Sequence, residues 1–333
     1  MKNLIYIENN ATDPHYNLAF EEYVFRHAET PVLLLWQNEP SVIIGKYQNT
    51  SEEINQDFIR KQGIHVVRRN TGGGAVYHDL GNLNYSFVIP DAETKVDFGT
   101  FTTPVVKALR SQGIPAEQTG RNDILVDGRK FSGNAQQFSD RRLLHHGTIM
   151  FDVDTENVAK ALKVKPGKFR SKAVKSVRSR VTNLKPYFDQ QGARAQIRDA
   201  AEFKALLLEW FRREYDMREV ELAAEQLAEI QKLREEKYDT YDWNYGRSPK
   251  ADVTRGGFFR CGYVEFGFRL KANKVQEVKI TGDFFAARDI TELEERFHGC
   301  EYTPEGILSV LSEADLVSYL GDVTAGELAD VIV

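Results

Sequence analysis

The chain has 333 residues, a length that predicts two domains or one large domain with an appendage. Its 41% hydrophobic and 28% charged residues are typical of a globular protein with a sizeable core, and its net charge of -5 argues against a general nucleic-acid coat. The longest apolar runs fall far short of the roughly 18 residues of a membrane helix, so we expect a cytoplasmic protein that does not contact membranes.

The N-terminal half alternates strand-like and helix-like segments. Residues 4–7 are a short apolar run, which Glu8 ends before a signal-peptide core could form. Asp13 followed by Pro14 predicts a helix start, and apolar residues then recur at helical spacing from Tyr16 to His27. Strand-like runs follow at residues 32–36, 41–44, 64–68, 84–89, 124–126 and 144–151, and helical stretches at 52–61, 104–111 and 155–162. Turn signals such as Asp127-Gly128 join strands directly, so we predict a largely antiparallel, mixed sheet covered by helices, an α+β fold.

The second half contains a predicted domain boundary. Helical patterns at residues 200–215 and 221–238 close the first unit, and the turn-rich sequence NYGRSP follows at 244–249. Beyond it, residues 257–270 and 275–281 read as strands, and residues 289–297, 303–320 and 325–333 read as helices. We therefore predict a first domain over residues 1–245 and a small α+β accessory domain over residues 250–333.

Charge is distributed unevenly along the chain. Residues 158–188 contain many lysines and arginines but no acidic residue, whereas residues 297–333 contain acidic residues but no lysine or arginine. A basic stretch of this kind is more often a solvated helix face than a site. It can also neutralise phosphates or steer an acidic partner.

The densest chemical signal is the segment RRNTGGGAVYHD at residues 68–79, directly after a predicted strand. Three consecutive glycines disfavour any regular element, because each loses much conformational entropy on folding. They suit a loop whose backbone N–H groups approach an anion. Arg68 and Arg69 add positive charge and paired donors suited to phosphate or carboxylate. Taken alone, a flexible hairpin with a charged edge explains the segment equally well.

A second cluster surrounds the predicted hairpin at residues 123–135 (DILVDGRKFSGNA). Strand alternation places Lys130 and Ser132 on one side and Phe131 on the other. A lysine in such a strand is usually a surface charge, but small neighbours such as Gly133 let it reach a polar pocket. Asp123 either caps a turn, which is the commoner role, or holds a divalent cation.

The third cluster is HHGT at residues 145–148, followed by SVRSRVTNL at residues 176–184. Adjacent strand residues point to opposite faces, so His145 and His146 cannot both ligate one metal ion. The other histidines are scattered, and two cysteines, Cys261 and Cys300, provide neither a disulfide framework nor a thiolate cage. We therefore expect no metal site built on histidine or cysteine.

Four segments together resemble the signature segments of lipoate–protein ligase A. They are RRNTGGGAVYHDLG at residues 68–81, NDILVDGRKFSGNA at 122–135, HHGT at 145–148 and SVRSRVTNL at 176–184. Their order and spacing are those of the family, so the match is highly specific. The tail, opened by WNYG at residues 243–246, resembles the C-terminal domain of the longer members. The resemblance implies the biotin/lipoate protein ligase-like α+β fold, with a catalytic domain over residues 1–245 and the accessory domain behind it.

The resemblance also implies an ATP-dependent activity. An enzyme of this family activates (R)-lipoate with MgATP to lipoyl-AMP, releases pyrophosphate, and transfers the lipoyl group to a lysine. The implied acceptors are lipoyl domains of 2-oxoacid dehydrogenase acyltransferase subunits and the glycine-cleavage H protein. Neither nucleic acid nor a membrane is an expected partner.

The family motifs assign roles to individual residues of this chain. The residues expected to contact ATP or the adenylate are Arg69, Gly74, Ala75, Val76, Tyr77, Lys130 and Arg178. The residues expected to contact lipoate are Thr71, Gly72, Gly73, His78 and Lys130. Thr71 replaces a residue that is often serine and keeps its hydroxyl, while Asp123 is a candidate Mg²⁺ ligand. The basic segment at residues 172–180 corresponds to a segment that closes over the adenylate.

Lys130 is the expected catalytic residue on chemical grounds as well. The attack of a carboxylate on ATP brings two anions together, and a lysine ammonium can neutralise both and stabilise the charge that builds on the α-phosphate. Arg69 and the glycine-loop amides can hold the phosphates in line. No residue need act as a covalent nucleophile.

Two rival functions remain to be separated from the ligase. An octanoyl- or lipoyl-transferase of the same fold moves an acyl group without ATP, and its cysteine-dependent versions need a thiolate in the catalytic half. Cys261 and Cys300 both lie in the tail, which disfavours those versions, and biotin ligase has a different glycine-rich pattern. A non-catalytic binding protein would show salt-dependent binding without turnover.

Overall fold

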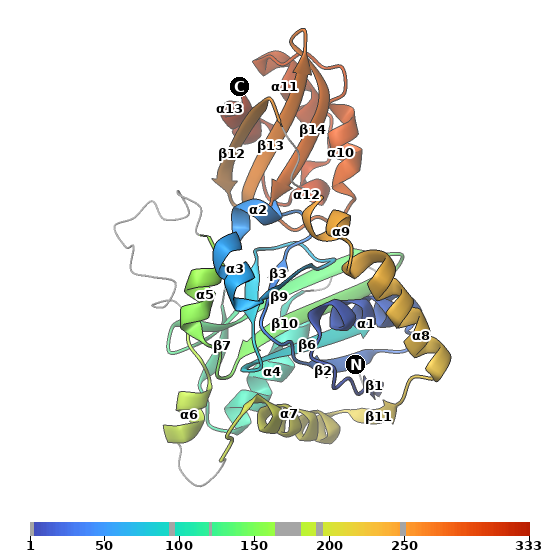
Figure 1. The fold of residues 1–333 in the computed structure, drawn as a ribbon, viewed down its shortest axis with the longest axis vertical. Helices are drawn as coiled ribbons and strands as arrows, with labels where there is room; N and C mark the ends of the chain where they lie inside the picture. The colour runs from blue at the N-terminus through green and yellow to red at the C-terminus, as the bar shows by residue number, and fades with distance from the viewer. Residues whose placement is uncertain (1–2, 93–96, 120–121, 164–180, 191–195, 247–250) are drawn as a thin grey trace.

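The computed structural model describes residues 3–92, 97–119, 122–163, 181–190, 196–246 and 251–333 (Figure 1). Its strands are β1 Asn3–Ile7, β2 Val32–Trp36, β3 Ser41–Ile44, β4 His65–Arg68, β5 Val76–His78, β6 Asn82–Ile89, β7 Ala116–Thr119, β8 Asp123–Val126, β9 Arg129–Ser139, β10 Arg142–Met150, β11 Asp216–Val220, β12 Val253–Phe259, β13 Gly262–Lys271 and β14 Lys274–Gly282. Its helices are α1 Pro14–His27, α2 Thr50–Glu53, α3 Gln56–Gln62, α4 Gly99–Ser111, α5 Thr155–Ala161, α6 Lys185–Gln190, α7 Ala200–Glu214, α8 Ala224–Leu233, the π-helix η2 Arg234–Tyr238, α9 Tyr241–Tyr245, α10 Ile290–Arg296, α11 Pro304–Ser312, α12 Leu316–Tyr319 and α13 Ala325–Ile332.

The first unit is built on an eight-stranded sheet in the order β11-β1-β2-β6-β10-β9-β8-β7. The pairs that β1 makes with β11 and β2 are parallel, and the remaining pairs are antiparallel. Beside this sheet lies a three-stranded sheet in the order β4-β3-β5, and the glycine-rich segment connects β4 to β5. The fold is therefore α+β with a largely antiparallel sheet, as the sequence predicts.

Two apolar clusters cover opposite faces of the large sheet. One cluster joins the sheet to α4 and α7 through residues such as Phe101 and Phe203, and the other joins it to α1 and the α8–η2 segment through residues such as Phe20 and Tyr238. Helix α1 begins where Asp13 and Pro14 predict, because the Asp13 carboxylate accepts hydrogen bonds from the backbone N–H groups of His15 and Tyr16.

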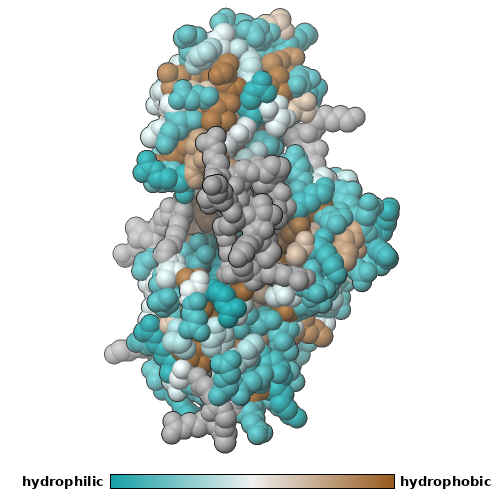
Figure 2. Space-filling model, turned by 90° about the vertical axis from the view of Figure 1, so that its left-hand side faces the viewer, coloured by the Kyte–Doolittle hydropathy of each residue, from teal (hydrophilic) through white to brown (hydrophobic). Residues whose placement is uncertain are grey.

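The last unit pairs β12, β13 and β14 in an antiparallel sheet with α10, α11, α12 and α13 packed on it. Figure 1 shows this unit as a separate lobe above the large sheet. The space-filling view in Figure 2 shows a largely hydrophilic face with scattered apolar patches, several of them on this upper lobe. The predicted boundary between 245 and 250 includes residues 247–250, which lie outside the described residues, so the exact division stays a prediction.

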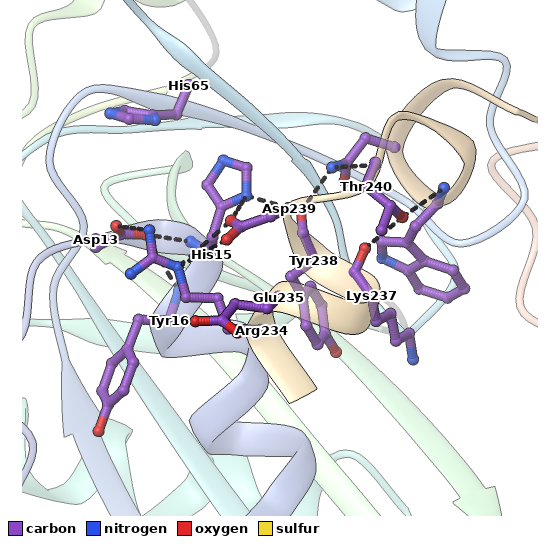
Figure 3. A network of polar contacts seen from close by, with 12 residues as sticks. Asp13, His15, Tyr16, His65, Arg234, Glu235, Lys237, Tyr238, Asp239 and Thr240 are labelled. Atoms are coloured by element: carbon purple, nitrogen blue, oxygen red, sulfur yellow. Dashed lines mark hydrogen bonds and ion pairs between the residues drawn. The ribbon is translucent and has the colours of Figure 1, made fainter. Parts of the chain in front are cut away.

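A polar network holds the chain that leads into the upper lobe against the start of α1 (Figure 3). Arg234 of η2 lies 2.9 Å from the Asp13 carboxylate and 3.2 Å from that of Asp239. The His15 ring nitrogen Nδ1 lies 2.7 Å from the carbonyl oxygen of Tyr238 and 3.1 Å from Asp239. These contacts hold η2 and Asp239 against the start of α1 before the chain turns toward the upper lobe.

Several expected elements are wrong in detail. The single strand expected at residues 257–270 is a hairpin of β12 and β13 that turns at Arg260 and Cys261. The helix expected at 303–320 is two helices, because Asp315 caps the start of a second one. The helix expected at 52–61 is likewise split into α2 and α3, and the stretch at 221–238 ends in η2. The short strands β5, β7 and β11 were not expected at all.

The helical spacing from Tyr16 to His27 predicts that His27 lies on the buried face of this helix as a core histidine, and this is wrong, since its side chain is exposed at the end of α1. Glu21 and Glu22 are buried instead. No helix in the described part of the chain is long and apolar enough to cross a membrane.

Candidate functional site

A cavity of about 490 Å³ lies between the first unit and the upper lobe. Many of the residues that the sequence singles out line it: Arg69, Gly73, Gly74, Ala75, Val76, His78, Asp123 and Lys130. Strand alternation separates the residues of β5, because Val76 and His78 face the cavity while the Tyr77 side chain packs with Val42 and Ile44 in an apolar cluster. Arg178 and the basic segment at 172–180 lie outside the described residues.

Arg69 organises the glycine loop, defined here as residues 69–75. Its Nε donates to the Thr71 hydroxyl at 2.9 Å, and its Nη2 donates to the carbonyl oxygens of Gly72 and Gly74 at 2.7 and 2.9 Å. Its Nη1 donates to the carbonyl oxygen of Ile43 at 3.1 Å. Burial lowers the pKa of Arg69 to about 10, and the negative charge of Glu21 opposes that shift, so the guanidinium stays charged at neutral pH.

Arg68 does not lie where its position in the motif suggests, which is beside a bound phosphate or carboxylate. It is 1% exposed, and its guanidinium donates to the carbonyl oxygens of Gly45, Gln48 and Trp243 at 2.7–2.9 Å. It also donates to the Thr50 hydroxyl at 2.7 Å. These donors hold protein groups together, so Arg68 is a structural brace and not a group that reaches an anion in the cavity.

Gly72 and Gly73 of the loop lie directly against the upper lobe. The Gly73 N–H donates to the Phe284 carbonyl oxygen at 3.3 Å, and a Cβ on Gly72 would lie 2.3 Å from that same oxygen. Tyr47 stacks on the Phe284 ring at 4.9 Å, and its carbonyl oxygen accepts from the Gly282 N–H at 2.9 Å. The upper lobe therefore packs directly on the loop.

Gly45, which the sequence analysis missed, packs against the glycine loop. It follows β3, and a Cβ at this position would lie 1.9 Å from the Gly73 carbonyl oxygen. We expect Gly45→Ala to displace the glycine loop and to lower the free energy of unfolding by about 2–3 kcal/mol, as overpacking against backbone does. Urea denaturation measures this. Gly326→Ala is the matched control, because nothing lies within 4 Å of a Cβ there; an equal effect of both substitutions would contradict the prediction.

Lys130 reaches the cavity as strand alternation predicts. It lines the wall while Phe131 is fully buried in the core below the sheet, and its Nζ lies 2.7 Å from Oδ1 of Asp123. The missing side chain of Gly133 gives it room, because a Cβ there would lie 3.0 Å from the Lys130 Nζ. The Lys130 side chain is 38% exposed, so its ammonium is open to a ligand.

Two buried donors in the cavity have no hydrogen-bond partner among the described residues. They are the ring nitrogen Nε2 of His78 and the amide nitrogen Nδ2 of Asn84, on side chains that are almost fully buried. Asn38 accepts from Asn17 with its oxygen and therefore offers its NH₂ group to Nδ1 of His78, at 3.1 Å. The His78 proton then lies on Nε2. Unpartnered buried donors are costly, so this wall suits a ligand that carries acceptors.

The state of His78 predicts a pH dependence of stability. Burial lowers its pKa to about 3, and the electrostatic effect of Arg69 and of the His146 ring acts in the same direction. The unfolded chain binds a proton near pH 6.5, so stability falls as the pH drops from about 6.5 toward 3, by up to about 1.4 kcal/mol per pH unit from this residue. Urea denaturation between pH 7.5 and 5 should show a shallower fall in His78→Gln than in the parent protein. Equal slopes would contradict the assignment.

His145 and His146 face opposite sides of β10, as expected. The His145 ring stacks on Phe101 at 4.8 Å, while His146 lines the cavity and its Nδ1 lies 2.9 Å from the carboxylate of Glu21. Within the described residues, no group of three or more histidine, cysteine or acidic side chains could hold a metal ion. Mg²⁺ commonly binds through one or two carboxylates together with phosphate oxygens, and Asp123 fits that mode.

Other residues of the cavity were not singled out from the sequence. Leu18 and Trp36 line its apolar part, and Arg260, Cys261 and Phe285 enter from the upper lobe. Cys261 belongs to the tail, and only the packing of the two units brings it to the cavity. No local sequence signal could have placed it there.

Two family models match the chain. The lipoyl protein ligase A/B catalytic domain matches residues 13–212, and the bacterial lipoate protein ligase C-terminus matches residues 248–332. Lipoate--protein ligase 1 of Staphylococcus aureus is 45% identical over 96% of this chain and 97% of its own length. Lipoate-protein ligase LplJ of Bacillus subtilis is 42% identical over 99% of this chain and all of its own length.

Solved structures similar to this chain are also described as lipoate ligases. LipL1 of P. falciparum in complex with lipoate superimposes with a TM-score of 0.76 at 25% identity, covering 94% of this chain and 95% of its own. A bipartite lipoate protein ligase of Thermoplasma acidophilum, described together with its E2 lipoyl domain, gives 0.64 at 31% identity, covering 76% and 100%. A lipoate-protein ligase A bound with ATP gives 0.62 at 28% identity, covering 74% and 99%. The chain belongs to the lipoate–protein ligase family.

Proposed function

We propose that this cavity activates lipoate with ATP as lipoyl-AMP and then passes the lipoyl group to a lysine of an acceptor protein. The observation that carries the proposal is the Lys130 ammonium, which lies open in the cavity that the glycine loop borders. Relatives support both ligands, since one similar structure is described as a complex with lipoate and another as bound with ATP.

In the first step, a lipoate carboxylate oxygen attacks the α-phosphorus of ATP, and the bond from that phosphorus to the bridging oxygen of pyrophosphate breaks. Lys130 offsets the charge of both anions and stabilises the charge that develops on the α-phosphate. The proposal assigns phosphate contacts to the backbone amides of Gly74 and Ala75 in the loop and of Val76 and Tyr77 at the start of β5. Arg69 holds the loop in shape through its bonds to the carbonyl oxygens of Gly72 and Gly74.

Of the residues expected to contact lipoate, Gly73 and His78 line the cavity and are assigned to its lipoate side, whereas Thr71 and Gly72 belong to the glycine loop but not to the lining among the described residues. The unpartnered Nε2 of His78 offers a donor, and Trp36 and Leu18 offer apolar surface. Asp123 would hold Mg²⁺ together with phosphate oxygens, and the ion would offset the charge of the pyrophosphate. Because Asp123 pairs with Lys130, binding of the ion there would free the ammonium for the substrates.

In the second step, a neutral lysine amine of the acceptor attacks the lipoyl carbonyl carbon, AMP leaves, and the amine loses a proton. We propose lipoyl domains of 2-oxoacid dehydrogenase acyltransferase subunits or the glycine-cleavage H protein as acceptors, in the cytoplasm. The E2 lipoyl domain described with the Thermoplasma acidophilum ligase supports the first of these.

The test measures pyrophosphate release and acceptor lipoylation with the purified protein, lipoate, MgATP and a lipoyl domain. We expect pyrophosphate only when lipoate is present, and lipoylation only when ATP is present. Acyl transfer from an octanoylated protein without ATP, lost in Cys261→Ser, would instead support the thiol-dependent transferase, because Cys261 lines the cavity. Binding of lipoate without either reaction would support the non-catalytic protein.

A further inference from the structure

A continuous chain of buried polar side chains runs from the apolar part of the cavity to the glycine loop. Trp36 Nε1 donates to the Ser86 hydroxyl at 2.9 Å, and that hydroxyl donates to the Glu21 carboxylate at 2.5 Å. On the other side of Glu21, the His146 ring nitrogen Nδ1 lies 2.9 and 3.1 Å from the two carboxylate oxygens.

The chain then continues from His146 to Arg69. The His146 Nε2 lies 2.8 Å from the Thr71 hydroxyl, and Arg69 Nε donates to that same hydroxyl at 2.9 Å. Every member is at most 9% exposed. Six side chains from five separate parts of the sequence thus form one hydrogen-bonded line that ends in the guanidinium organising the loop.

The donors and acceptors of this line give it one direction when the His146 ring is neutral. Arg69 can only donate, so the Thr71 oxygen accepts from it and its hydroxyl proton is free to point to His146. An ionised Glu21 can only accept, so it takes the proton on Nδ1 of His146. In a neutral imidazole the remaining nitrogen, Nε2, is then an acceptor for the Thr71 hydroxyl. All bonds run toward Glu21.

We propose that Glu21, His146 and Thr71 are positioning residues that set the glycine loop for ATP. Ionised Glu21 holds His146 as the neutral Nδ1–H tautomer, His146 accepts the Thr71 hydroxyl, and Thr71 holds Arg69 across the loop carbonyls of Gly72 and Gly74. The inference rests on the proposed function, in which this loop binds the phosphates.

Charge balance supports the same assignment. A buried guanidinium is costly without a compensating anion. Glu21 is the acidic residue whose charge favours ionised Arg69, although hydrogen-bonding side chains separate the two. The line therefore supplies Arg69 with both a counter-charge and a fixed orientation, and no member of it other than Arg69 needs to approach ATP.

The first test compares Thr71→Val, which removes the hydroxyl at nearly constant volume, with Thr71→Ser, which keeps it. For Thr71→Val we expect kcat/KM for ATP to fall about 10- to 100-fold, the range for a lost hydrogen bond to a charged group, and KM for ATP to rise more than KM for lipoate. Thr71→Ser should recover most of that loss. The control Thr102→Val removes another buried hydroxyl, which bonds Phe98 and Gln118, and should leave both KM values unchanged.

The second test reads the protonation of the His146 ring directly in the parent protein, and a substitution serves only to assign its signals. Long-range ¹H–¹⁵N spectra of imidazole-labelled protein, with the His146 signals assigned through His146→Gln, should show a neutral ring protonated on Nδ1. Glu21→Gln places an amide NH₂ near Nδ1 and should reduce kcat/KM for ATP, whereas Glu294→Gln, at a buried carboxylate of the upper lobe, should not.

The outcomes separate this inference from the proposed function. If the parent protein releases no pyrophosphate with lipoate, the proposed function fails. The inference about the hydrogen-bonded line is then tested by the protonation of the His146 ring, which the spectra measure without any activity. If the parent is active but Thr71→Val or Glu21→Gln raises KM for lipoate alone, these residues only shape the acyl pocket and the inference is overturned. A His146 ring that is protonated on Nε2, or on both nitrogens, also overturns it.

Discussion

Replacing Lys130 with alanine is expected to lower lipoate-dependent pyrophosphate release at least about a hundredfold, on the scale of losing one preorganised contact to a transition state. The ammonium lies 2.7 Å from Asp123 in the cavity wall. Its removal takes a positive charge away from the part of the wall that the lipoate and ATP anions approach. Charge repulsion then adds to the lost stabilisation of the α-phosphate.

The measurement is a coupled pyrophosphate assay at saturating lipoate and ATP, with unfolding midpoints recorded for each variant. Lys61→Ala, at an exposed lysine of α3, is the control and should retain the parent rate. Because the Lys130 side chain is 38% exposed, its loss should cost little stability. A decrease below about tenfold in a folded Lys130→Ala protein would contradict a direct part in the chemistry.

The parts of this site that could be predicted from sequence are those set by local chemistry. Asp13 and Pro14 predict the start of α1 because capping involves only neighbouring residues. The alternation of β9 likewise predicts that Lys130 and Phe131 separate to the cavity and the core. The fold class follows from the order of strands and turns.

The parts that could not be predicted depend on contacts between distant segments. Glu21 and Glu22 lie on the helix side that a pattern of apolar spacing treats as solvated, yet both are buried by partners far along the chain. The segment from Gly282 to Phe285 contacts the glycine loop and its surroundings only when the upper lobe packs against the first unit. The hairpin at Cys261 was missed because its turn carries a positive φ at Gly262 and no Asn-Gly or Asp-Gly signal.

Arg68 shows how a motif can mislead, and its substitution carries the largest expected effect on stability. We expect Arg68→Met to lower the free energy of unfolding by about 4 kcal/mol, since several buried carbonyl oxygens lose their donor together. These are the carbonyls of Gly45, Gln48 and Trp243, which tie the loop after β3 to α9. Methionine keeps an apolar side chain of similar length, so the loss of stability measures the contribution of the guanidinium and its hydrogen bonds.

Urea denaturation followed by circular dichroism measures this change, and Arg60→Met on the exposed face of α3 is the matched control, with an expected change within about 0.5 kcal/mol. Arg68→Lys separates charge from geometry. A lysine keeps the charge but has one donor nitrogen in place of a planar fork, so it should recover only a minor part of the loss. If Arg68→Met were as stable as the control yet could no longer bind ATP, Arg68 would be a ligand residue after all, as its place beside Arg69 first suggests.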